Sequence, residues 1–230
     1  MRPPAILTGS ISFARSTLLD LVYPPRCGGC DKRGILLCDT CLLLIDHPAS
    51  EKSVERIDAV ISAGVFKEPL RSAIHKLKYE SDTPLAKPLA LLISGALAED
   101  DRWVAEDGEP PVIVAVPLHS SRRRARGYNQ SELLARELGR ITGWPVEKQL
   151  VRVRPTPPQV GLHADQRQEN VRDAFKWNGE DAPTRVLLVD DVCTTGATLS
   201  ECAFALMSAG TDHIVAATVA VASGGANSDS

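Results

Sequence analysis

The segment VLLVDDVCTTGATL, residues 186–199, indicates how the chain is organised. Its first four residues are branched and apolar, two of them β-branched valines, which favours a buried strand. Two adjacent carboxylates, Asp190 and Asp191, end this run, and small hydroxylated residues with one glycine follow. An apolar helical stretch then covers 199–209 and stops at Gly210. The segment therefore predicts a strand, a loop and a helix in succession.

The loop of this segment has the properties of a phosphate site. Backbone N–H groups of residues 194–198 can converge on an anion, and the start of the next helix adds positive potential. Threonine hydroxyls can donate to phosphate oxygens, and Gly196 permits close approach of the backbone. Because carboxylates repel a phosphate, the acid pair suits sugar hydroxyls instead. The expected ligand is a ribose 5-phosphate; the alternative is a buried strand whose acids cap the next helix.

The same string resembles the phosphoribosyl pyrophosphate (PRPP) motif of type I phosphoribosyltransferases. The resemblance implies that Asp190 and Asp191 bind the ribose hydroxyls and form the catalytic pair, while the loop binds the 5′-phosphate. The residues expected to bind PRPP are Asp190, Asp191, Val192, Cys193, Thr194, Thr195, Gly196, Ala197 and Thr198.

Length and composition fit one α/β core with a small appendage, since the 230 residues are 43% hydrophobic. No apolar run reaches the ~18 residues of a membrane span. Residues 1–23 lack a continuous apolar core and a cleavage site, so we expect no secretory signal and a cytoplasmic location. A net charge of −3 argues against a constitutive nucleic-acid binder.

Four of the six cysteines form two CxxC pairs, Cys27 with Cys30 and Cys38 with Cys41. Each pair can form a tight knuckle, and four thiolates make a tetrahedral site that leaves no open position. In a chain without a secretory signal this spacing predicts a structural zinc ion. The alternative is a loop with two disulfides or free thiols.

The remaining pattern predicts strands and helices in alternation. We expect helices at 11–22, 68–79, 84–98 and 131–141, and strands at 57–66, 111–117, 146–154 and 214–222. Residues 155–169, rich in proline and glycine, are predicted to be a mobile loop that closes over the ligand. Cations near the end of helix 68–79 are interpreted as a solvated face. The expected division is 1–50 (helix and ribbon), 51–222 (51–110, then a PRPP-binding core at 111–222) and a disordered tail, 223–230.

Four arginines follow strand 111–117, where α/β proteins bind ligands. Guanidinium groups match pyrophosphate oxygens, although a solvated charge run is the alternative. The residues expected on the pyrophosphate side are Pro117, Leu118, His119, Arg122, Arg124, Arg126 and Arg167.

Several stretches together resemble the ComF family, also called competence protein F. They are LLDLVYPP at 18–25, the double CxxC, VPLH at 116–119, RGYNQ at 126–130, the loop at 155–170 and the PRPP motif. The resemblance implies a type I phosphoribosyltransferase-like (Rossmann-like) parallel sheet flanked by helices, a small N-terminal zinc ribbon, and a role in DNA uptake during natural competence.

Two functions fit these observations. One is a phosphoribosyltransferase (a pentosyltransferase) that uses PRPP and Mg²⁺ and transfers phosphoribosyl to an acceptor that the sequence does not name. The other is a non-catalytic PRPP- or nucleotide-binding module of the DNA-uptake machinery, with a helicase or DNA-processing factor as partner. Contact with single-stranded DNA is weakly supported, because aromatic residues for base stacking are few.

Overall fold

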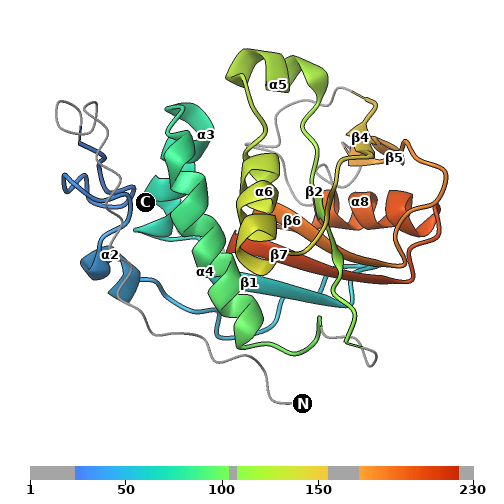
Figure 1. Ribbon diagram of the computed structural model, residues 1–230, viewed down its shortest axis with the longest axis horizontal. Helices are drawn as coiled ribbons and strands as arrows, with labels where there is room; N and C mark the ends of the chain where they lie inside the picture. The colour runs from blue at the N-terminus through green and yellow to red at the C-terminus, as the bar shows by residue number, and fades with distance from the viewer. Residues whose placement is uncertain (1–23, 104–107, 155–170, 223–230) are drawn as a thin grey trace.

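The computed structural model describes residues 24–103, 108–154 and 171–222 (Figure 1). The predicted helix 11–22, the loop 155–169 with Arg167, and the tail 223–230 lie outside the described residues. The described elements, in chain order, are α2 (Asp39–Leu43), β1 (Ala59–Val65), α3 (Leu70–Tyr79), η1 (Thr83–Leu85), α4 (Ala86–Ala98), β2 (Val112–Ala115), α5 (Ser120–Arg126), α6 (Gln130–Thr142), β3 (Val146–Glu147), β4 (Leu150–Arg152), β5 (Phe175–Trp177), β6 (Arg185–Cys193), α8 (Ala197–Met207) and β7 (His213–Val221).

The main sheet has five strands in the order β1-β7-β6-β2-β3, and every neighbouring pair is parallel. Parallel neighbours need crossover connections, and helices supply several of them here. The predicted strand 146–154 is divided in two: β3 joins the main sheet, whereas β4 pairs with β5 in a separate antiparallel ribbon. The α/β class predicted from the sequence, a parallel sheet flanked by helices, is confirmed.

Strand β6 lies in the middle of the sheet and is buried on both faces, as its continuous apolar run predicts. Leu187 and Val189 belong to the core that α3, α4 and α6 share. Val186 and Leu188 point into the opposite core, against α8. In Figure 1, α4 and α6 cross one side of the sheet and α8 lies on the other.

β6 continues further than the apolar run predicts, through Asp190 and Asp191 to Cys193. The reason is tertiary, because β7 remains paired with β6 as far as Cys193 and Val221. The other neighbour, β2, pairs with β6 only as far as Ala115 and Val189. Beyond Val189, no described strand pairs with this edge of β6. Among the described residues, no helix is long and apolar enough to cross a membrane.

Candidate functional site

A cavity of about 470 Å³ lies at the C-terminal ends of β2 and β6, where β2 leaves its neighbour. Open parallel sheets bind ligands at this kind of position. The whole predicted PRPP segment lines the cavity, and so do Pro117, Leu118, Arg122 and Arg126 from the predicted pyrophosphate side. His119 and Arg124 are not among the lining residues.

The two carboxylates are more buried than residues at an exposed strand end would be, with 9% of Asp190 and 4% of Asp191 exposed. Asp190 Oδ1 accepts hydrogen bonds from Ser131 Oγ at 2.8 Å and from the backbone N–H of Asp191 at 2.9 Å. Asp191 Oδ1 pairs with Lys78 Nζ at 2.8 Å. The other oxygen of Asp191, Oδ2, is buried and has no hydrogen-bond partner among the described residues.

This environment moves the acid pair away from ordinary carboxylate behaviour. Burial raises the pKa of Asp190 to about 7, and the neighbouring charge of Asp191 adds to the increase. Burial opposes the charge of Lys78, but Asp191 outweighs it, so the pKa of Lys78 is raised and the amine stays protonated. A group that exchanges a proton near neutral pH in a cavity is typical of binding and catalytic sites.

The threonine loop connects β6 to α8 and requires a glycine for two reasons. Gly196 has a φ of +84° at the N-cap of α8, a conformation that side chains disfavour. A Cβ there would clash with Val54 Cγ2. The backbone of Ala197 donates to Thr195 Oγ1 at 3.4 Å. The local shape of the loop therefore already requires the glycine, apart from any need for close approach by a ligand.

The arginine run forms a helix, α5, which the sequence interpretation did not predict. His119 caps it by accepting from the Ser121 backbone N–H, and Gly127, with a φ of +86°, ends it. Figure 1 shows α5 projecting beyond the sheet, and none of its residues is buried. Arg126 lies over the Tyr79 ring, 5.2 Å from its centroid, and donates to Gln130. Arg122 and Arg126 thus face the cavity, whereas Arg123 pairs with Glu132 at 3.3 Å.

Sequence reasoning missed several residues that line the cavity. Lys78 was interpreted as part of a solvated face, yet it contacts Asp191. The sequence did contain a signal that Lys78 faces inward. Leu70, Ile74 and Leu77 form the buried face of α3, and residue 78, four positions after Ile74, continues that face. The other missed polar lining residues are Tyr79, Gln130, Ser131 and Arg152.

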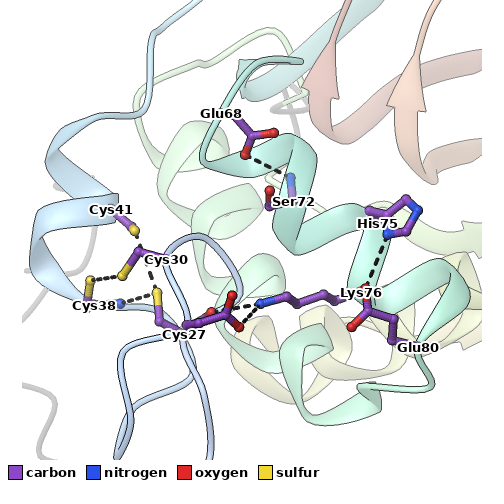
Figure 2. Close-up of polar contacts among 10 residues, drawn as sticks. Cys27, Cys30, Cys38, Cys41, Glu68, Ser72, His75, Lys76 and Glu80 are labelled. Atoms are coloured by element: carbon purple, nitrogen blue, oxygen red, sulfur yellow. Dashed lines mark hydrogen bonds and ion pairs between the residues drawn. The ribbon is translucent and has the colours of Figure 1, made fainter.

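The four predicted zinc ligands come together in a second place (Figure 2). Their Sγ atoms all lie within 4.8 Å of one another, and two pairs, Cys27 with Cys41 and Cys30 with Cys38, are 3.6 Å apart. Tetrahedral zinc with Zn–S bonds of about 2.3 Å would separate the sulfurs by about 3.8 Å. None of the four is in a disulfide. The cluster can therefore hold a structural zinc ion.

Within the cluster, Cys27 favours the thiolate form, whereas burial raises the pKa of Cys41. Burial by itself would raise the pKa of Cys27, but backbone N–H groups, that of Cys38 first among them, lower it to about 6. The Cys38 N–H lies 3.4 Å from Cys27 Sγ. A thiolate held by backbone donors is the form that binds zinc.

Helix α3 contacts both the cysteine cluster and the cavity. Lys76 donates to the carbonyl of Cys27 at 3.2 Å and to Asp31 Oδ1 at 2.5 Å, as Figure 2 shows in part. A Cβ at Gly28 would lie 2.9 Å from Ala73 Cβ, so the first knuckle packs closely on this helix. The same helix ends one turn later at the cavity, where Lys78 pairs with Asp191.

The fold and the cavity together define an α/β protein with a parallel sheet, a cavity at the carboxyl ends of its strands and a four-cysteine cluster near residues 27–41. Among solved structures, the chain resembles a hypoxanthine phosphoribosyltransferase from Trypanosoma cruzi complexed with IMP, with a TM-score of 0.34 and 16% identity over 58% of this chain and 62% of that one. It also resembles the hypoxanthine-guanine enzyme of L. donovani, with a TM-score of 0.34 and 15% identity over 59% and 67%.

Relatives by sequence identify the family to which the chain belongs. The chain is 33% identical over 199 residues to "Competence protein F" of Haemophilus influenzae, covering 82% of this chain and 86% of the relative. It is 32% identical over 201 residues to "DNA utilization protein YhgH" of Salmonella typhi, and 31% over 195 residues to that of Escherichia coli K12, each covering over four fifths of both chains. No protein-family model matches. The chain belongs to the competence protein F family.

Proposed function

We propose that this protein binds PRPP, or a related ribose 5-phosphate, in the cavity between β2 and β6. The carboxylates of Asp190 and Asp191 accept hydrogen bonds from the ribose hydroxyls, and the backbone of 194–198 holds the 5′-phosphate. The observation that carries the proposal is convergence: the acid pair, the threonine loop, and Arg122 and Arg126 of α5 line one cavity.

The reaction that suits this arrangement is phosphoribosyl transfer. An acceptor would attack C1 of the ribose, the C1–O bond would break, and diphosphate would leave with the bonding electrons. Arg122 and Arg126, both at the cavity, would stabilise the charge of the leaving group. Mg²⁺ would enter with the diphosphate and take most of its ligands from substrate and water. With a pKa of about 7, Asp190 can take up the proton that the acceptor loses.

The second candidate is binding without turnover. The relatives named for competence and DNA utilization support a role in DNA uptake, so the ligand would regulate a partner in that machinery, such as a helicase or DNA-processing factor. For this role we propose a cytoplasmic location. We further propose a structural zinc ion on Cys27, Cys30, Cys38 and Cys41 within an N-terminal unit, 1–50, that precedes the phosphoribosyltransferase-like domain, 51–222.

Calorimetric titration with PRPP and Mg²⁺ tests binding, and diphosphate release in the presence of candidate acceptors separates the two functions. Asp191→Asn removes a charge-assisted acceptor, and the affinity should fall ~10-fold. The matched control is Asp181→Ala, an exposed acid outside the cavity lining, which should bind like the parent protein. A folded parent protein that binds neither PRPP nor ribose 5-phosphate would refute the proposed ligand.

A further inference from the structure

The acid pair already has a cation of its own. Lys78 Nζ lies 2.8 Å from Asp191 Oδ1, and 21% of the lysine side chain and 5% of the aspartate side chain are exposed. The preceding residue, Leu77, is fully buried, which fixes the last turn of α3 and so the origin of the lysine side chain. This ion pair therefore belongs to the cavity wall. It is largely shielded from solvent, which a surface ion pair is not.

The cavity has other cations, and two of them lie over aromatic rings. Arg152 lies over the Phe175 ring, 5.1 Å from its centroid. Arg126 lies over Tyr79 and donates to Gln130. Among the salt bridges of the described residues, the acid pair takes part only in that with Lys78. Two adjacent buried carboxylates repel each other, and the Lys78 ammonium, 2.8 Å from Asp191 Oδ1, offsets that repulsion.

The ion pair uses one oxygen of Asp191 and leaves the other without a partner. Asp191 lines the cavity, and its Oδ2 is buried with no hydrogen-bond partner among the described residues. A buried carboxylate oxygen is rarely left unpaired in the working state of a protein. A ligand hydroxyl can donate to Oδ2 while the ammonium keeps Oδ1, so the two do not compete. Lys78 thereby orients the carboxylate for the ligand.

We infer that Lys78 is a positioning residue that takes the place of a divalent cation at Asp191, so that the sugar end of the cavity binds ribose 5-phosphate without metal. The inference rests on the proposed function and refines it. An ammonium supplies one positive charge and three donors. The divalent ion is then needed only for the diphosphate of PRPP, which ribose 5-phosphate lacks.

The test is calorimetric titration of ribose 5-phosphate, in EDTA and in Mg²⁺, with the parent protein and three variants. The parent should bind equally in both buffers. Lys78→Met should bind at least ~10-fold more weakly in EDTA, and Mg²⁺ should restore part of the loss, because the vacated position next to Asp191 accepts a cation. Lys78→Arg keeps the charge and should stay within ~3-fold of the parent. Arg71→Met removes an exposed charge from the same helix and should change neither value.

Three results would overturn the inference. The first is a parent protein whose binding of ribose 5-phosphate needs Mg²⁺, a result that requires no variant and so does not depend on their folding. The second is a Lys78→Met variant that binds like the parent in EDTA. The third is a loss that neither Mg²⁺ nor arginine restores, which would assign Lys78 a purely structural role. A parent protein that binds ribose 5-phosphate in neither buffer would refute the proposed function itself.

Discussion

Asp190→Asn should make the protein more stable at alkaline pH while weakening its binding of ligand. Asp190 is buried, and its pKa is raised from 3.8 to about 7 by burial and by the charge of Asp191. A carboxyl group whose pKa is higher in the folded chain contributes stability that is complete below the unfolded value and is lost as the pH rises through the folded value.

The magnitude follows from these two pKa values. A difference of about three between the folded and unfolded chains corresponds to about 4 kcal/mol at pH 8, where the carboxyl is ionised in both states. Asparagine keeps an oxygen that can accept from Ser131 and from the backbone of Asp191. Its amide nitrogen needs a new acceptor, which costs ~1–2 kcal/mol. The net gain is about 2 kcal/mol, or ~4–8 °C in Tm for a chain of this size.

The assay is thermal or urea unfolding of parent and variant between pH 8 and pH 5. Comparing the two proteins at each pH cancels the titration of groups that they share, such as Asp31 and Asp100, whose pKa values are lowered by Lys76 and Arg102. The gain should be largest at pH 8 and close to zero at pH 5. About one pH unit above the unfolded pKa, only ~1.6 kcal/mol of the carboxyl's penalty remains, and the cost of the asparagine amide cancels it. In the same samples, ribose 5-phosphate should bind ~10-fold more weakly to the variant. A variant that is no more stable at pH 8, or equally more stable at both pH values, would refute the reasoning.

Two further predictions concern the loop and the cysteine cluster. Gly196→Ala should lower stability by at least ~1–2 kcal/mol, because of its positive φ and the contact with Val54, whereas Gly95→Ala in α4, where an added Cβ meets nothing within 4 Å, should be neutral or stabilising in the same melts. Metal analysis should find about one zinc per chain, and Cys27→Ser should lower that content; purified protein without zinc, with the four cysteines in disulfides, would contradict the metal assignment.

The sequence determined the features that contiguous residues encode. The run at 186–199 predicted strand, loop and helix correctly, because apolar β-branched residues, acids and a helix-compatible stretch follow one another without interruption. The CxxC spacing likewise predicted which four cysteines cluster. The arginine run was harder to interpret, since it has no apolar periodicity. It is helical because His119 and Gly127 cap a short segment.

Only the tertiary structure decided how the acid pair is held. Asp190 and Asp191 belong to a buried strand because β7 continues beside them while β2 stops, and no local pattern encodes the length of a neighbouring strand. Ser131 lies 59 residues from Asp190 in the sequence. Lys78, which pairs with Asp191, belongs to α3, a helix still earlier in the chain. The apolar stripe of α3 fixed which helix face Lys78 occupies, but what that face meets depends on how α3 packs against the sheet. Short-range patterns therefore specified the loop that suits a phosphate. Long-range packing specified the electrostatic environment of the acid pair beside it.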